Sequence, residues 1–444
     1  MSASKTSVKL SLILGTALIM TGCSSINPFA SREDPPLPGE RVSVLELQKD
    51  LSPNSASSEA TAFIAPQMWE NEFWPQRGGY PNHAMQNLAF TTGEFKQLWS
   101  VSTGAGASPQ TPQSTQPILV GGTIYTLDTK LDLKAFNTAN GKQLWQINLK
   151  PAQEDDVVIG GGLSFADNTL YAVNGFNEVI ALSPQDGKIM WRKPLPAPAR
   201  AAPTLLNQKL FVQLIDNQIL ALDSKDGTDL WRYTGFAADS GLLGAASPAA
   251  TQKLVVAGFS SGELTGFDID TGAILWSDSL APRRRIGGIT SVSDITALPV
   301  IDRDLVIAAG FGGRMLALDA QTGRRVWTQD IGALETPWVA NNHIFVMTAD
   351  RKLISLDRAT GALNWVQDMT SVQKNEAHGN WTGPVMAGDR LITASSTGHI
   401  AEIDPQNGHL LRLTKTSGHV TVPPLVANGV LYLLSDNGKL TAYR

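Results

Sequence analysis

The chain has 444 residues, of which 42% are hydrophobic and only 17% are charged, so it can bury a large core and general disorder is excluded. Its formal net charge of −5 argues against nucleic acid as the main partner. Forty glycines and twenty-five prolines, without a long helical periodicity, favour many short strands joined by turns.

Residues 1–22 are typical of a lipoprotein signal peptide. Lys5 and Lys9 precede an apolar run that ends at Met20 and is too short to span a bilayer comfortably. The segment from Met20 to Cys23 resembles a bacterial lipobox, so Cys23 is the expected site of lipid attachment. The alternative is an ordinary secretory leader with a chance cysteine. Because Cys23 is the only cysteine, a disulfide framework and a thiol-rich metal site are both excluded.

Residues 23–90 are predicted to contain the lipidated cysteine and a tether. The segment is rich in proline and serine and lacks periodicity. A flexible chain of about 65 residues has a root-mean-square reach of roughly 40–50 Å. Trp69 and Trp74 are more apolar than their surroundings and are expected to pack on the domain that follows. By resemblance to the enteric sorting rule, Ser24 directs the protein to the outer membrane.

A repeated segment organises residues 91–444. Its clearest copy is Ala317-Leu-Asp-Ala-Gln-Thr-Gly323-Arg-Arg-Val-Trp327, in which an Asp and Gly turn closes a hairpin. Seven such turns occur, and in each the position four residues after the glycine holds Trp145, Trp191, Trp231, Trp276, Trp327, Trp365 or, in the last copy, Arg412. Two alternating strands precede each turn, so every unit is a four-stranded meander of propeller-blade length.

The two ends of this region predict the number of blades. The last unit stops after its third strand at Arg444, whereas the segment around Trp99 is a fourth strand without a blade before it. Joining them predicts an all-β fold, an eight-bladed β-propeller of four-stranded antiparallel blades closed by pairing of the N-terminal and C-terminal segments. Trp99 and the six repeat tryptophans are then structural residues that dock one blade on the next.

Compact catalytic or metal motifs are not evident. Gly258-Phe-Ser-Ser-Gly262 matches a nucleophile elbow, but it falls between two strands with no helix behind it, which favours a hairpin turn. The six histidines have no ligand spacing, and no carboxylate cluster reads as a calcium loop. We therefore expect no catalytic, cofactor-binding or metal-binding residues.

Two long connectors are the strongest candidates for binding. One follows Trp231 and carries Leu242 and Leu243; the other follows Trp276 and carries Arg285, Asp294 and Thr296. Both join the outer strand of one blade to the inner strand of the next, so they should lie side by side on one face. Long loops on a rigid scaffold are where binding residues usually lie. These five connector residues are the predicted partner contacts. The alternative is that the loops only cap the channel.

The Ala-x-Asp-x-x-Thr-Gly-x-x-x-Trp repeat resembles the quinoprotein-type repeat shared by PQQ-dependent alcohol dehydrogenases and by the BamB family, lipoproteins of the outer-membrane β-barrel assembly machine. Lipobox, tether, blade number and terminal closure together are similar to the BamB family. The resemblance implies a monomeric, non-catalytic scaffold without cofactor at the periplasmic face of the outer membrane. It also implies docking on the POTRA domains of BamA, the barrel-forming subunit, beside the other lipoproteins of the machine.

The connectors depart from the family pattern at two positions. Leu243 stands where the family has an arginine, and Thr296 stands where it has an aspartate, whereas Asp294 matches. Whether the run from Arg283 to Arg285 replaces the lost charge stays open.

Two other functions remain as alternatives. The chain resembles the PQQ-dependent dehydrogenases in the repeat alone, and those enzymes usually carry a calcium site and a vicinal cysteine pair, which a single cysteine cannot form. The second alternative is a periplasmic scaffold or sensor with another protein partner.

Overall fold

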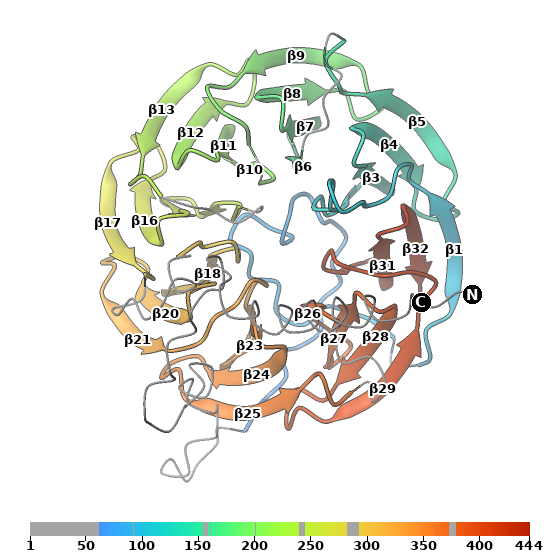
Figure 1. The fold of residues 1–444 in the computed structure, drawn as a ribbon, viewed down its shortest axis with the longest axis vertical. Helices are drawn as coiled ribbons and strands as arrows, with labels where there is room; N and C mark the ends of the chain where they lie inside the picture. Colours follow the sequence, from blue (N-terminus) through green and yellow to red (C-terminus); the bar gives the residue numbers. More distant parts are fainter. Residues whose placement is uncertain are drawn as a thin grey trace, which may run out of the picture. The chain divides into compact units, whose positions relative to one another are not determined.

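A computed structural model describes residues 62–91, 93–152, 154, 159, 161–199, 201–238, 245–281, 293–372 and 379–444. Within these residues the chain forms thirty-two strands and no helix. The strands make eight four-stranded antiparallel sheets, arranged as the blades of a propeller around a central region that we call the channel (Figure 1). The predicted fold class is therefore confirmed.

The first four blades each consist of four strands that are consecutive in the chain. Blade 1 comprises β2 (Ile118–Val120), β3 (Thr123–Leu127), β4 (Asp132–Asn137) and β5 (Gln143–Asn148). Blade 2 comprises β6 (Gly161–Ala166), β7 (Thr169–Asn174), β8 (Glu178–Leu182) and β9 (Ile189–Pro194). Blade 3 comprises β10 (Thr204–Leu206), β11 (Lys209–Gln213), β12 (Gln218–Asp223) and β13 (Asp229–Thr234). Blade 4 comprises β14 (Ala249–Ala250), β15 (Leu254–Gly258), β16 (Glu263–Asp268) and β17 (Ile274–Ser279).

The remaining blades follow the same order except for the last strand of blade 8. Blade 5 comprises β18 (Val300–Asp302), β19 (Leu305–Gly310), β20 (Arg314–Asp319) and β21 (Arg325–Gln329). Blade 6 comprises β22 (Trp338–Ala340), β23 (His343–Met347), β24 (Lys352–Asp357) and β25 (Leu363–Asp368). Blade 7 comprises β26 (Trp381–Ala387), β27 (Arg390–Ser395), β28 (His399–Ile403) and β29 (Leu410–Lys415). Blade 8 comprises β30 (Leu425–Ala427), β31 (Val430–Ser435), β32 (Lys439–Tyr443) and β1 (Gln97–Ser102).

The turn before Trp327 shows why the repeat folds as a hairpin. The Asp319 carboxylate accepts hydrogen bonds from the backbone N–H of Thr322 at 2.8 Å and from its hydroxyl at 2.7 Å. Gly323 has a φ of +69°, which a residue with a side chain rarely adopts. The register then shifts between Ala317 and Leu318, which marks a β-bulge in the outer strand.

The ring closes where the two ends of the propeller meet. Strand β1 pairs antiparallel with β32, and Trp99 lies opposite Ala442. The pairing extends beyond the strands, because the N–H of Lys96 donates to the Arg444 carbonyl at 2.7 Å and the reverse bond measures 2.9 Å. Blade 8 is thus completed from both ends, as the sequence predicts.

Residues 62–91, which we call the strap, correct the predicted start of the folded part. The sequence predicts a tether that runs to residue 90, but the strap lies inside the ring (Figure 1) and buries Trp74, Met85 and Leu88 to 1% exposure or less. These apolar side chains need cover, and the inner strands of the blades provide it. The expectation that Trp69 and Trp74 pack on the propeller holds, whereas residues 23–61 of the predicted tether lie outside the described residues.

Candidate partner-binding surface

The meander gives the propeller two different faces. The turns between the first and second strands and between the third and fourth strands lie on one face, the turn face. The turns between the second and third strands lie on the opposite face, together with every connector from an outer strand to the next inner strand. We call this opposite face the connector face. Both long connectors singled out in the sequence belong to it.

Three of the five predicted partner contacts, Leu242, Leu243 and Arg285, lie outside the described residues. The other two are buried: Asp294 is 1% exposed and Thr296 is 8% exposed. The Asp294 carbonyl accepts the N–H of Phe311 at 2.9 Å, which fixes the connector to blade 5. The side chains of Asp294 and Thr296 are buried in this structure, and their contact with a partner stays a prediction.

The structure reveals a different residue in the first of these connectors. Phe236 is 72% exposed, although its backbone is held on both sides. Its N–H donates to the Glu263 carboxylate at 3.2 Å, and its carbonyl accepts the Asn217 side-chain amide at 2.7 Å. An aromatic side chain fixed by its backbone loses little conformational entropy on binding, which is the property of an interface anchor. The sequence signal was an aromatic residue just after the end of the alternating strand that carries Trp231.

Glu263 is the group that fixes this connector. The carboxylate is 4% exposed and accepts hydrogen bonds from the Tyr233 hydroxyl at 2.6 Å and the Thr265 hydroxyl at 2.9 Å. Burial, together with the neighbouring Glu263 charge, raises the pKa of Tyr233 to about 12, so Tyr233 remains a hydrogen-bond donor at neutral pH. The backbone of Phe236 is therefore attached to a satisfied polar cluster of blades 3 and 4.

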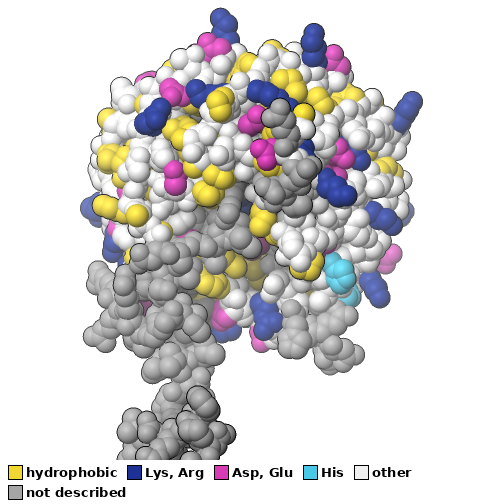
Figure 2. Space-filling model, turned by 45° about the horizontal axis from the view of Figure 1, so that its top comes forward, with side chains coloured by type: hydrophobic (Ala, Val, Ile, Leu, Met, Phe, Trp, Pro, Cys, Tyr) yellow, Lys and Arg dark blue, Asp and Glu magenta, His cyan; other side chains and the backbone are white. Residues whose placement is uncertain are grey.

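Ile215 adds a second apolar side chain at this place. It is 38% exposed and lies in the turn of blade 3 that also contains Asn217, whose carbonyl accepts the Gly235 N–H at 2.8 Å. We call Ile215 and Phe236 the Phe236 surface. On the face seen in Figure 2, apolar and charged side chains are interspersed. An exposed aromatic residue whose backbone is fixed is a more specific candidate than a broad apolar patch.

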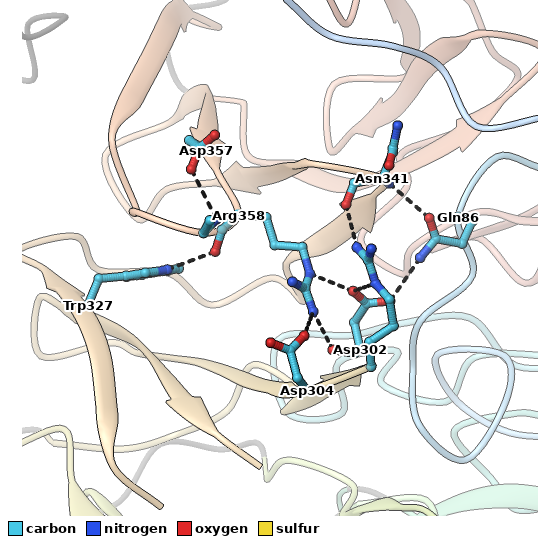
Figure 3. Close-up of polar contacts among 9 residues, drawn as sticks. Gln86, Asp302, Asp304, Trp327, Asn341, Asp357 and Arg358 are labelled. Atoms are coloured by element: carbon cyan, nitrogen blue, oxygen red, sulfur yellow. Dashed lines mark hydrogen bonds and ion pairs between the residues drawn. The ribbon is translucent and has the colours of Figure 1, made fainter. Parts of the chain in front are cut away.

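The seven tryptophans of the repeat lie at the blade junctions. Each contacts the turn glycine of the next blade: a Cβ on Gly361 would lie 2.6 Å from Trp327 Cδ2, so only glycine fits. The Trp327 indole N–H donates to the Arg358 carbonyl at 2.9 Å in the same turn (Figure 3). The equivalent bond to the neighbouring turn is made by Trp99, Trp145, Trp231, Trp276 and Trp365. Trp191 contacts Gly227 in the same position.

Arg412 occupies the equivalent position of blade 7 for a topological reason. The fourth strand of blade 8 comes from the other end of the chain, so blade 8 has no turn between its third and fourth strands. A tryptophan would have no glycine turn to contact. Arg412 instead donates to the Gly93 carbonyl at 2.9 Å and lies 3.6 Å from a carboxylate oxygen of Glu402.

The channel contains titratable side chains that the sequence did not single out. The N–H at His83 Nδ1 donates to the Pro299 carbonyl at 2.7 Å, and burial lowers the pKa of His83 to about 4. Burial raises the pKa of Glu335 to about 7, although its carboxylate accepts hydrogen bonds from the Thr382 hydroxyl at 2.9 Å and the Gly383 N–H at 3.2 Å. Both groups are therefore uncharged over part of the pH range in which they would be charged in water.

Two kinds of feature are absent from the described residues. They contain no group of three or more histidine, cysteine, aspartate or glutamate side chains that could hold a metal ion. They also contain no helix with the length and apolar character needed to cross a membrane.

The repeat and the fold define the class of quinoprotein-type eight-bladed propellers, and the comparisons identify the family. A family model described as "Outer membrane protein assembly factor BamB" matches residues 57–159, 132–367 and 365–444. The chain belongs to this family. The BamB of Yersinia pestis is 23% identical over 354 residues, which cover 78% of this chain and 88% of that protein. The BamB of Salmonella typhimurium is 24% identical over 351 residues, with the same shares covered.

Solved structures show the same fold. BamB from Moraxella catarrhalis has a TM-score of 0.65 and 20% identity, covering 79% of this chain and 98% of that chain. A quinohemoprotein alcohol dehydrogenase from Comamonas testosteroni has a TM-score of 0.64 and 12% identity. The match covers 84% of this chain and 80% of that chain. Because an assembly factor and an enzyme share the fold, the fold alone does not decide the function.

Proposed function

We propose that the protein is a non-catalytic scaffold lipoprotein of the outer-membrane β-barrel assembly machine. In this proposal Cys23 anchors it at the periplasmic face of the outer membrane of a Gram-negative bacterium. The connector face docks on the POTRA domains of a BamA-type subunit, next to the other lipoproteins of the machine. Membership of the BamB family is the observation that carries the proposal, and the match to the family model extends over the whole propeller.

The Phe236 surface is the part of the connector face that we assign to docking. The other proposed contacts are Leu242, Leu243, Arg285, Asp294 and Thr296, of which Asp294 and Thr296 are buried within the second connector in this structure. Truncation of a hot-spot residue costs an interface about 2 kcal/mol or more, which corresponds to a roughly thirtyfold change in affinity, and we propose Phe236 as such a residue.

Titration calorimetry with the soluble POTRA domains of the cognate BamA tests this assignment. Phe236→Ala should weaken binding at least tenfold. Leu411→Ala is the matched control, because Leu411 is 56% exposed but lies on the outer strand β29, away from the connector face. Equal affinities for both variants and the parent would remove the Phe236 surface from the proposal. If a pull-down from solubilised membranes recovers no barrel-assembly subunit, a scaffold or sensor with another partner becomes the better proposal.

A PQQ-dependent dehydrogenase is the second candidate, and the structural likeness to the Comamonas enzyme favours it. The residues fit a quinone poorly. Trp74, Met85 and Leu88 of the strap fill part of the channel, and the single cysteine at position 23 cannot form a vicinal pair. Appearance of quinone absorbance after incubation with PQQ and calcium would restore this candidate.

A further inference from the structure

The strap contacts the inner part of all eight blades in turn. The strap first contacts blade 6, where Phe63 packs on Phe345 and the Ile64 carbonyl accepts the Asn341 side-chain amide. From Asn71 to Leu88 the path then proceeds from blade 8 through blades 1 to 7 in chain order, so that these eighteen residues complete one circuit of the channel. The contacts are Asn71 with Val426, Trp74 with Leu119, Pro75 with Phe165, Gln76 with Leu205, Pro81 with Ala250, Asn82 with Ile301, Gln86 with Asn341 and Leu88 with Met386.

Many of these contacts are backbone hydrogen bonds of the kind found in a sheet. The N–H of Trp74 donates to the Leu119 carbonyl at 2.7 Å, and the N–H of Leu119 donates back at 2.9 Å. Leu88 makes two such bonds with blade 7, donating to the Met386 carbonyl at 3.1 Å and accepting the Gly388 N–H at 2.9 Å. The inner strands would otherwise present free edges to the channel, and the strap pairs with them.

The side chain of Gln86 connects the strap to blades 5 and 6 at once (Figure 3). The Gln86 amide donates to the Asp302 carboxylate at 3.0 Å and accepts the Asn341 N–H at 2.9 Å. Asp302 is also 2.6 Å from the Arg358 guanidinium, and the Arg358 carbonyl accepts the Trp327 indole N–H. A continuous set of hydrogen bonds therefore runs from a blade junction to the strap.

Closure of the ring does not depend on the strap, because β1 and β32 already complete blade 8. The strap is therefore a second element with its own contacts. We propose that residues 62–91 are a bound peptide, that the inner edges of the eight blades are its binding site, and that it fastens the N-terminal end of the chain to the whole ring. A mechanical force applied to that end is then distributed over all eight blades, and strand β1 does not bear it alone.

Proteolytic cleavage of the folded protein between the strap and strand β1 tests this proposal. A protease site is inserted between Gly93 and Glu94, which are both exposed, and the folded chain is cleaved there. The N-terminal fragment should remain with the propeller through gel filtration and leave only in denaturant. Loss of the fragment on the first passage, with the propeller still folded by circular dichroism, would overturn the proposal.

Two substitutions in the cut chain provide a matched comparison. Leu88→Ala removes a side chain that is 0% exposed and should speed release of the fragment at least tenfold. Ile64→Ala changes a strap residue that is 68% exposed and should leave the release rate within twofold of the parent. Equal release rates for the two variants would contradict a specific binding site. Release is followed by the fluorescence of a dye at the N-terminus of the fragment.

Discussion

At the scale of single residues, the tryptophan of the repeat acts on the next blade. Its ring covers the neighbouring turn glycine, and its N–H satisfies a carbonyl of that turn. The amphipathic ring thus combines apolar burial with one hydrogen bond, which explains why the same residue type recurs at this buried or half-buried position. Where no turn follows, at Arg412, a cation that binds two acceptors takes its place.

This account predicts the cost of removing one junction. Trp327→Ala should lower the free energy of unfolding by about 3–5 kcal/mol, because it leaves a cavity over Gly361 and an unpaired carbonyl. Val326→Ala is the control, since Val326 is the adjacent bulged residue and is 40% exposed. Urea denaturation measures both. A loss below about 1 kcal/mol for the tryptophan variant would contradict its role in docking the blades.

Glu335 and His83 predict opposite pH dependences of stability. The pKa of Glu335 is about 7 in the fold and 4.5 in a model peptide, so the unfolded chain ionises first and stability falls as pH rises from about 4.5 to 7. The pKa of His83 is lowered from 6.5 to about 4, so the unfolded chain is protonated first and stability falls as pH drops from about 6.5 to 4. Each effect amounts to at most about 3–4 kcal/mol.

Single variants should separate the two effects. Glu335→Gln should show stability that rises between pH 4.5 and 6.5, because only the His83 effect remains. His83→Asn should show stability that falls over the same range, and asparagine tolerates the φ of +60° at this position. Thermal unfolding at a series of pH values provides the measurement. Parallel profiles for the parent and both variants would mean that neither group titrates as stated.

At the scale of elements, strand β1 should be indispensable for the ring. Deleting residues 95–103 removes the fourth strand of blade 8 and the Trp99 contact with Gly141, and it exposes the edge of β32. The melting temperature should fall sharply. Leu98→Ala serves as the control, because this side chain is 48% exposed and its loss should have little effect. An unchanged melting temperature after the deletion would refute closure by the two ends of the chain.

The elements also show what could be predicted from the sequence. The blades were predictable because each turn repeats the same local chemistry, an Asp, a Gly and a Trp at fixed spacing. The strap has no such period, since it meets successive blades at irregular intervals of one to five residues and its buried side chains face different partners. Asp294 matched a family motif, but its burial depends on packing between blades 4 and 5 and could not be read from the motif.

At the scale of the whole molecule, the ring is held both at its outer junctions and along its channel. The tryptophans fasten neighbouring blades, blade 8 joins the two ends of the propeller, and the strap connects the inner edges. Such a scaffold can present loops in a fixed arrangement on the connector face. A backbone-fixed but exposed side chain such as Phe236 is useful only on a rigid support of this kind.

The proposed lipid anchor should affect location and not stability. Cys23→Ser removes the modification site, whereas every contact described for the propeller begins at residue 62 or later. Because two or three acyl chains are needed for firm attachment, in cells that lack the BamA interaction the variant should leave the outer-membrane fraction and appear in the periplasmic extract. Its melting temperature should match that of the parent protein extracted in detergent. Retention of Cys23→Ser in washed membranes of cells that lack the BamA interaction would show that another segment holds the protein there.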